Sequence, residues 1–546
     1  MTTALYFHPD GYTMGGPKLM GRNAAGNSFL RGWLAHSEQH DAVALVEQAE
    51  YAEAFRRLCT QHAPARPTRV LGPAQLADGG VTHVYYPGPN IHELAWQRQF
   101  LGRAKFSLTG ITHTTASSGA MDSITDLLTA PLAPWDALIC TSAAVVQTVR
   151  TVLEAQAEYL RWRFGATRFV PPQLPLIPLG INVADFAFSA AQRAAARERL
   201  GVAPGTLVVL FTGRLSFHAK AHPLAMYQAL ARAQAATGAR LQLVECGWHA
   251  NEYLANAFAE AARAACPDVP VTVLDGRRAE DRSTAWASAD LFCSLSDNIQ
   301  ETYGLTPLEA MAAGLPVVVS DWDGYRETVR DEIDGFRVPT LMPPAPLGGD
   351  LARRHALGVD SYDLYCGHSS QLVAVDVAAT AAAFEKLIRA PELRARMGEA
   401  GRARAQEFDW SVIVRRYEDL WRTLDEARRA HKDETAPPAP WPARMDPFAA
   451  FAGYPTHTLA PTARLRLARE DAAEALARWR ALAMVKFSAL AAPSVEECDA
   501  ILARLARGPA TAAQLVAEFA PERRPLVFRG LVWLVKLGVV ELDSAA

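Results

Sequence analysis

Short apolar runs alternate with longer helical patterns over residues 1–430, and this alternation limits the fold more than any other feature. The runs are apolar throughout rather than at every second residue, which is typical of strands buried on both faces. One helical pattern, 143–164, places Val145, Val149 and Leu153 on a shared face. Strand–helix–strand order then predicts a parallel sheet with helices on both sides. In the first half we expect strands at 4–8, 41–46, 82–87, 106–113 and 136–141.

The alternation restarts after residue 184, beyond a segment with Pro, Gly and Asn at 175–186 that we interpret as a hinge between domains. The sequence thus predicts an α/β fold with two Rossmann-like doubly wound domains, 1–183 and 184–407, that face a cleft. Open sheets of this kind bind ligands at the carboxyl ends of their strands. The strands expected in the second domain are 207–212, 240–245, 271–275, 290–295 and 316–320.

A third region follows a Pro-rich linker at 431–448. We expect a small, mainly α accessory domain at 449–546 that resembles a winged helix. Its last helical pattern carries the apolar runs 526–528 and 531–535, which favours docking to protein or oligomerisation over a DNA groove. The expected elements are one long helix at 461–489, short helices at 494–507, 510–519 and 523–537, and a strand at 539–542.

The composition excludes several classes of protein. A net charge of -3 over 546 residues gives no general attraction to nucleic acid. Seven scattered cysteines without a C-x-x-C pair argue for a reducing compartment and against a thiolate zinc site. No uncharged apolar stretch reaches the ~18 residues of a membrane span, and the first ten residues do not read as a signal peptide. We therefore expect a cytoplasmic protein.

The most informative stretch is 297–338, in which Glu301 and Glu309 stand eight residues apart. A turn followed by a helix that starts at Thr306-Pro307 and closes at Gly314 explains this spacing. The backbone N–H groups of such a helix start attract an anion. Carboxylates beside a phosphate cannot bind it, so we expect both glutamates to accept hydrogen bonds from sugar hydroxyls.

Arg214 and Lys220 directly follow the expected strand 207–212. Two cations at a strand end can neutralise a diphosphate, the arginine as a bidentate fork and the lysine as a point charge. In the first domain a glycine-bearing loop contains Gly15 and Gly16, and His113 ends the strand at 106–113. Glycines let the backbone approach a ligand closely, and the histidine could donate to a sugar hydroxyl.

Here the sequence resembles the family 4 retaining glycosyltransferases, which have the GT-B fold. The run E-T-Y-G-L-T-P-L-E-A-M-A-A-G-L-P-V-V-V-S, which begins at Glu301, looks like the Glu-x7-Glu signature of that family. The resemblance covers roughly residues 1–428 and is stronger in the second half. Further matching segments, in order, are 177–182, 213–220, 287–292 and 410–421.

This resemblance implies a donor site for a nucleotide-diphosphate sugar, either a UDP- or a GDP-sugar, on 184–407. It implies acceptor entry from 1–183 and a closing helix at 408–430 that packs back toward the first domain. It also implies a metal-independent transfer without a cofactor. The acceptor hydroxyl could belong to a glycan, a lipid-linked glycan, a protein or a small molecule.

The roles implied for individual residues follow the motif. Glu301 should contact the donor sugar, Glu309 the ribose, and Arg214 and Lys220 the diphosphate. His113 should approach the donor sugar, so the implied catalytic residues are Glu301, His113, Arg214 and Lys220. The backbone of Tyr303, Gly304 and Leu305 should contact sugar and phosphate, with Gly16, then Gly15, as the donor-loop glycine.

Several features depart from the family pattern. The spacing from Arg214 to Lys220 is one residue longer than usual, and Glu245-Cys246-Gly247 replaces the usual Gly-x-Gly. Residues 341–371 read as an inserted loop. Asp321-Trp322-Asp323 resembles a metal-binding Asp-x-Asp, but we interpret it as a plain turn. For the basic aromatic stretch 161–164 we expect a packed helix end, with peripheral membrane contact as the alternative.

Two alternatives to transfer remain open. A sugar phosphorylase or nucleotide-sugar hydrolase could use the same fold. A regulatory protein that binds a sugar nucleotide could use 449–546 as an interaction or DNA-binding module.

Overall fold

The computed structural model describes residues 1–13, 21–431, 439–487 and 489–543. The chain divides into two compact units, Met1–Trp441 and Pro442–Ala546, and each is described by itself. The division falls inside the stretch that the sequence predicts as a linker.

The first unit begins with a parallel sheet whose strand order, in the described residues, is β3-β2-β1-β4-β5-β6. Alternate residues of its strands face two different cores, as expected of a sheet covered on both sides. Leu5 and Ala44 pack with helices α2 and α17, while Ala4 and Val43 face the core that contains α4, α5 and α6. The strands are β1 (Thr3–Tyr6), β2 (Ala42–Leu45), β3 (Thr68–Leu71), β4 (His83–Tyr85), β5 (Ser107–Ile111) and β6 (Ala137–Ile139). The main helices are α2 (Gly21–His36), α3 (Ala49–His62), α4 (His92–Gln99), α5 (Ser118–Asp126) and α6 (Ala143–Phe164).

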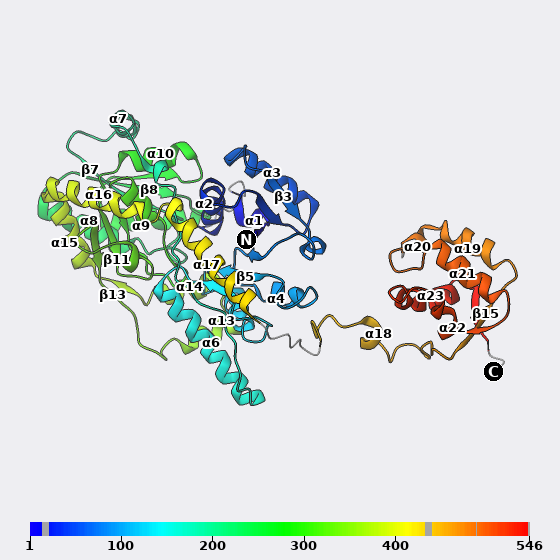
Figure 1. Ribbon diagram of the computed structural model, residues 1–546. Coiled ribbons are helices and arrows are strands. Elements are labelled where there is room, and N and C mark those ends of the chain that lie inside the picture. The colour runs from blue at the N-terminus through cyan, green and yellow to red at the C-terminus, as the bar shows by residue number, and fades with distance from the viewer. Residues whose placement is uncertain (14–20, 432–438, 488, 544–546) are drawn as a thin grey trace. The chain divides into compact units, whose positions relative to one another are not determined.

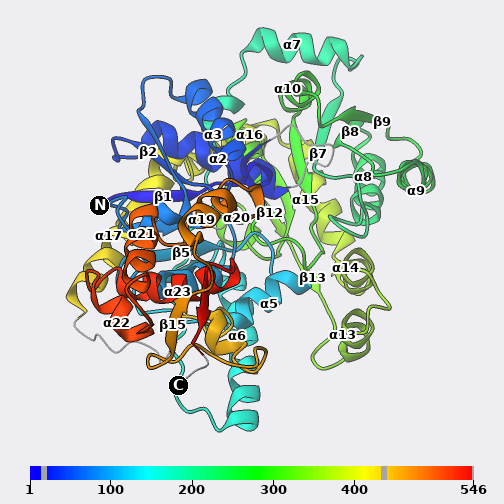
Figure 2. The ribbon, with the colours of Figure 1, turned by 90° about the vertical axis from the view of Figure 1, so that its right-hand side faces the viewer.

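The second sheet is also parallel, and its strand order is β12-β11-β10-β7-β8-β9. Val208 and Leu210 of β7 face the core with α10 and α11, whereas Val209 and Phe211 face α8 and α15. Figure 2 shows α8, α10 and α15 around the strands. The strands are β7 (Leu207–Thr212), β8 (Leu241–Gly247), β9 (Val271–Asp275), β10 (Leu291–Ser294), β11 (Val317–Ser320) and β12 (Gly335–Val338). The helices are α7 (Ala190–Arg199), α8 (Leu224–Thr237), α9 (Glu252–Ala265), α10 (Ala279–Ser288), α11 (Thr306–Ala312), α15 (Val377–Arg389) and α16 (Pro391–Gln406). The prediction of two Rossmann-like domains is confirmed.

Helix α17 (Trp410–Ala430) leaves the second domain and packs on the first, as the yellow ribbon of Figure 1 shows. Its aromatic side chains drive this contact. Trp410 lies edge-on to Phe29 at 5.6 Å, and Trp421 lies 5.2 Å from the ring of His83. The buried face of one helix thereby ties the two domains into one core.

Three expectations about elements are wrong. Strands β3 and β12 were not predicted, and both lie at edges of their sheets. The segment 341–371 is not a plain loop, because it contains α13 (Gly349–Ala356) and α14 (Tyr362–Ser370) between the short strands β13 (Thr340–Leu341) and β14 (Ala374–Val375). The end of α6 is not packed, because Trp162 is 79% exposed and Phe164 is 69% exposed.

The second unit combines helices with a small antiparallel sheet of order β16-β15-β17. The predicted long helix at 461–489 is wrong, because Arg464–Leu467 form strand β15. Leu465 of that strand is fully buried while its neighbours Arg464 and Arg466 are exposed, and this period of two is that of a strand. The elements are α18 (Pro447–Ala450), β15, α19 (Ala472–Arg480), α20 (Ala483–Lys486), α21 (Val495–Leu505), β16 (Ala510–Thr511), α22 (Ala512–Ala517), α23 (Arg524–Lys536) and β17 (Val540–Leu542).

Of the helices in the described ranges, none combines the length and apolar character that crossing a membrane requires.

Candidate active site

The loop between β10 and α11 carries the first predicted glutamate at the carboxyl edge of the second sheet. Helix α11 begins at Thr306 with Pro307 in its first turn, and Gly314 follows its end with a φ of 76°. Gly304 has a φ of 79°, and a Cβ there would lie 2.0 Å from Cε1 of Tyr325. Only glycine fits such a position, so the turn brings the Glu301 backbone close to the start of α11.

Lys220 and Glu301 form an ion pair across this edge. Both side chains are mostly buried, with 21% of the lysine and 11% of the glutamate exposed. Burial alone would raise the pKa of Glu301, but the charge and hydrogen bond of Lys220 and the backbone of Tyr303 and Thr302 outweigh it and lower that pKa. Burial would likewise lower the pKa of Lys220, and Glu301 raises it. Each group therefore keeps the other charged.

Arg214 lies beside this pair but has other partners. Its Nη2 donates to the backbone oxygen of Ala219 at 2.9 Å and to the side-chain oxygen of Gln300. A guanidinium has five N–H donors, so among the described contacts the hydrogens of Nε and Nη1 remain available for a ligand. Arg214 and Lys220 thus offer two positive charges and unused N–H donors near the start of α11. This combination suits a ligand with several negative charges.

Glu309 lies in the first turn of α11. Burial raises the pKa of its carboxyl to about 7, although the nearby charges of Arg282 and Lys220 oppose this. Among the described residues, no side-chain donor hydrogen-bonds this carboxylate. A carboxylate that titrates near neutral pH and has spare acceptor capacity is suited to binding hydroxyl groups.

Tyr303 and Leu305 complete the predicted turn. The Tyr303 side chain is buried in the core, and its hydroxyl has no hydrogen-bond partner among the described residues. The Leu305 carbonyl accepts the first helical hydrogen bond, from the Glu309 N–H at 3.0 Å. The predicted contacts of these backbones with a ligand stay a prediction.

Loops of the first domain meet the second domain at this edge. The Thr302 hydroxyl donates to the His113 carbonyl at 3.0 Å, and the Thr141 hydroxyl donates to the Thr302 carbonyl at 3.0 Å. At the start of α6, Ser142 donates to Asp323 at 2.6 Å. The structure thus brings His113 next to the segment that carries Glu301, while Gly15 and Gly16 lie outside the described residues.

The departures from the expected pattern have local explanations. Glu245 is buried and accepts a 2.6 Å hydrogen bond from the Tyr227 hydroxyl, and burial raises its pKa to about 7. In the Asp-x-Asp run, Asp323 accepts from Ser142, and Asp321 lies 3.4 Å from Arg337. Within the described ranges, no cluster of three or more His, Cys, Asp or Glu side chains suited to a metal is found.

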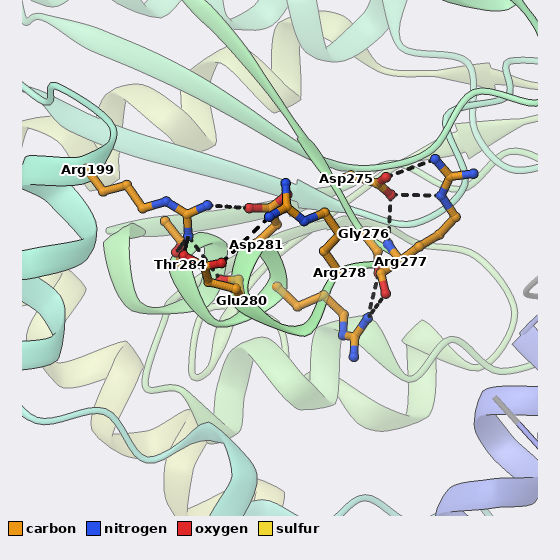
Figure 3. Close-up of polar contacts among 9 residues, drawn as sticks. Arg199, Asp275, Gly276, Arg277, Arg278, Glu280, Asp281 and Thr284 are labelled. Atoms are coloured by element: carbon orange, nitrogen blue, oxygen red, sulfur yellow. Dashed lines mark hydrogen bonds and ion pairs between the residues drawn. The ribbon is translucent and has the colours of Figure 1, made fainter. Parts of the chain in front are cut away.

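The loop after β9 adds an arginine network that sequence reasoning missed. Arg277 holds Asp275 through two side-chain hydrogen bonds of 2.9 and 2.8 Å, and Arg199 donates to Asp281 at 2.6 Å (Figure 3). The hydrogen bond from Arg277 lowers the pKa of Asp275. Arg282 donates to the carbonyl of Gly276 at 2.9 Å. These contacts fix the loop, and the charge of Arg282 acts on Glu309.

Gln300 and Tyr362 are two further residues that sequence reasoning missed. Gln300 precedes Glu301 and bonds Arg214, and adjacency to the motif was the only available signal. Tyr362 belongs to the segment 341–371, which the sequence predicts as an inserted loop, yet its hydroxyl lies within hydrogen-bond distance of Gln300 and Thr114.

Residues 206–346 match the family described as Glycosyl transferases group 1. This segment is a glycosyl transferases group 1 domain. It holds Arg214, Lys220, Glu301 and Glu309, whereas His113 lies outside it.

Curated relatives carry glycosyltransferase names. The phosphatidyl-myo-inositol mannosyltransferase of Mycobacterium leprae is 31% identical over 144 residues, which are 26% of this chain and 29% of that protein. The D-inositol 3-phosphate glycosyltransferase of Kineococcus radiotolerans is 29% identical over 275 residues, which are 49% of this chain and 54% of that protein. The chain thus spans about half or less of these relatives.

The solved structures of Anabaena Alr3699/HepE are similar in fold. The complex with UDP has a TM-score of 0.51 and 17% identity, and the match covers 78% of this chain and all of that chain. The complex with UDP and glucose has a TM-score of 0.50 over the same shares. The group 1 domain therefore sits within a GT-B arrangement of two Rossmann-like domains.

Proposed function

We propose that the chain is a retaining glycosyltransferase that moves a sugar from a nucleotide-diphosphate sugar to an acceptor hydroxyl. One observation carries the proposal. Two cations and two carboxylates gather at one sheet edge: Lys220 pairs with Glu301, Arg214 bonds the neighbouring Gln300, and the charge of Lys220 acts on Glu309. This charge pattern suits a diphosphate flanked by two sets of hydroxyls.

When the donor binds, Lys220 and Glu301 exchange each other as partners for groups of the ligand. The diphosphate takes the ammonium of Lys220 and the free N–H groups of Arg214, which releases Glu301 to accept hydrogen bonds from the donor sugar. Glu309 accepts from the ribose hydroxyls. Because the ion pair keeps both groups charged before the ligand arrives, this exchange needs no change of protonation.

In the reaction the bond between the anomeric carbon and the diphosphate oxygen breaks, and the bond to the acceptor oxygen forms on the same face. The acceptor proton passes to the departing phosphate oxygen, so charge and atoms balance. Arg214 and Lys220 stabilise the negative charge that develops on that phosphate. We assign no carboxylate nucleophile, and we place His113 beside the donor sugar. Domain closure excludes water from the reacting sugar.

The finer features of this proposal follow from the same site. The donor is a UDP- or GDP-sugar on 184–407, and the acceptor enters from 1–183. Arg214 and Lys220 supply the positive charge, so we propose transfer without a metal. We place the protein in a reducing cytoplasm, in keeping with its seven buried free cysteines. We assign 449–546 to docking of a protein partner or of a second copy of the chain.

The test is a donor screen with product analysis, with and without an acceptor. Wild-type protein should bind one nucleotide sugar and form a glycoside of unchanged anomeric configuration. Free sugar alone would identify a hydrolase, and sugar phosphate that forms only when inorganic phosphate is added would identify a phosphorylase. Tight binding without turnover, together with specific DNA binding by 449–546, would favour a regulator and contradict the proposal.

A matched pair of lysine variants sharpens this test. Lys220→Met should lose transfer. Lys386→Met should keep it, because the Lys386 ammonium is an exposed group 3.7 Å from Glu332.

A further inference from the structure

The helix pair α13–α14 lies against both Rossmann-like domains within the first unit. On the side of the first domain, the Ser118 hydroxyl is 3.0 Å from Nε2 of His355. On the side of the second domain, a Cβ on Gly367 would lie 2.9 Å from Cβ of His218. The segment therefore packs on the loop that carries Arg214 and Lys220 while it also contacts the loop that follows His113.

Tyr362, the first residue of α14, connects these two sides through its hydroxyl. The side-chain nitrogen of Gln300 donates to the Tyr362 oxygen at 3.0 Å. The Tyr362 oxygen is 3.3 Å from the hydroxyl of Thr114, the residue after His113. Because the phenol oxygen accepts from Gln300, its own hydrogen is available to Thr114.

The Gln300 amide carries this connection to Arg214. An arginine only donates hydrogen bonds, so the oxygen of Gln300 must face Arg214 and the nitrogen must face Tyr362. The Gln300 N–H also donates to the Asn298 side chain at 2.9 Å, which fixes the backbone of the residue. Both the oxygen and the nitrogen of the Gln300 amide therefore have a fixed partner. The Gln300 oxygen in turn holds Nη2 of Arg214, which limits the orientations of the guanidinium.

We propose that Tyr362 is a positioning residue for Arg214. Its hydrogen bond with Gln300 orients the Arg214 guanidinium toward the diphosphate. Its contact with Thr114 makes this orientation depend on contact between the two Rossmann-like domains. The inference rests on the proposed function, because it assigns Arg214 to the departing phosphate.

Enzyme kinetics on Tyr362→Phe test the inference, because this change removes the hydroxyl and keeps the ring. We expect kcat to fall about tenfold, as for the loss of one well-placed hydrogen bond. The donor Kd should change less than about threefold, because the guanidinium acts mainly on the charge that develops during the reaction. Tyr365→Phe is the matched control: it makes the same change on the same helix, where the ring stacks on His355, and it should leave kcat unchanged.

A double-mutant cycle separates positioning from packing. In an Arg214→Ala background, Tyr362→Phe should have no further effect on kcat beyond about twofold, because the residue that it positions is gone. Gln300→Leu should reproduce the loss and should not add to it. Full additivity in both cycles would overturn the inference, as would an equal loss in Tyr365→Phe.

Failure of the inference is distinct from failure of the proposed function. Wild-type protein that transfers sugar but shows additive effects contradicts only the role of Tyr362. Wild-type protein that binds no nucleotide sugar contradicts both.

Discussion

Each Rossmann-like domain contains a largely buried ion pair, and the two pairs differ in how completely they are shielded from solvent. In the first domain Arg98 and Asp136 are both 0% exposed. Asp136 also accepts from the backbone N–H groups of Leu108 and Ala133, at 2.9 and 2.8 Å. Arg98 also donates to the carbonyl of Phe106 at 2.8 Å. In the second domain Lys220 and Glu301 retain some exposure.

This difference separates a pair that suits a structural role from one that suits ligand binding. A fully buried pair cannot exchange partners without leaving a buried charge, so it stabilises one conformation. A pair that retains some exposure can open for a ligand. Buried charge alone therefore does not mark a candidate site, whereas a partly exposed pair at a sheet's carboxyl edge is a candidate.

The largest expected effect is a loss of stability when the fully buried pair is broken. Asp136→Ala leaves Arg98 buried without its counter-ion, which should lower the free energy of unfolding by about 3–5 kcal/mol. Chemical denaturation measures this loss. Glu154→Ala is the control, because it removes an exposed partner of Arg161 and should cost under about 1 kcal/mol. Equal losses would contradict the distinction between the two kinds of pair.

The next effect is on activity, at the exchangeable pair. Lys220→Met and Glu301→Gln should each lower the transfer rate on the order of 10²–10³, by analogy with the loss of one transition-state donor. The melting temperature should shift by only a few degrees, because both groups retain access to solvent. Rate assays and thermal melts on the same samples check this. Wild-type rates in either variant would count against the site.

A smaller effect is expected at the turn between Glu301 and α11. Gly304→Ala combines a positive φ with a clash against Tyr325, and it should lower stability by about 1–3 kcal/mol and weaken donor binding. Gly358→Ala provides the control, because it has a φ of 69° and nothing within 4 Å of the added Cβ. If both variants bind the donor as the wild type does, the turn does not shape the site.

The smallest effect is a pH dependence at Glu309. Its pKa is raised to about 7 in the folded state, so the native carboxyl holds its proton more tightly than the unfolded one. The unfavourable contribution of Glu309 to stability therefore grows from about pH 4.5 to 7 and is complete above 7. Glu309→Gln should therefore stabilise the fold more at pH 8 than at pH 5.

Donor binding should show the opposite trend. Affinity for a nucleotide sugar should rise through pH 7 as Glu309 ionises and becomes the better acceptor for ribose hydroxyls. Calorimetric titrations at pH 6 and pH 8 measure it, and the rise should be absent in Glu309→Gln. A rise of equal size in that variant would assign the titration to another group.

The sequence predicts the two-domain fold well because long apolar runs report burial on both faces. It does not predict β3, whose first residue Thr68 is exposed and whose next two are only partly buried, because an edge strand carries a weaker apolar signal. It misassigns Arg464–Leu467 because a short alternation of arginine and leucine is also compatible with a helix. For short segments of mixed polarity, tertiary contacts determine whether a helix or a strand forms.

The residues of the candidate site also fall into those that the sequence predicts and those that it does not. Four candidate residues can be predicted because each follows a strand or lies at the start of a helix within residues 206–346. They are Arg214, Lys220, Glu301 and Glu309. Gln300 and Tyr362 cannot be predicted in this way, because their roles arise from hydrogen bonds between residues 62 apart in sequence. The pairing of Lys220 with Glu301 rather than with open solvent is likewise visible only in three dimensions.

The most direct test of the exchangeable pair is a thermal-shift measurement with a panel of UDP- and GDP-sugars on the wild type and on Lys220→Met. A ligand that binds only the native state raises the melting temperature. At least one compound of the panel should raise the melting temperature of the wild type and leave that of Lys220→Met unchanged. No shift with any compound, or the same shift in both proteins, would contradict the assignment of this pair to the donor site.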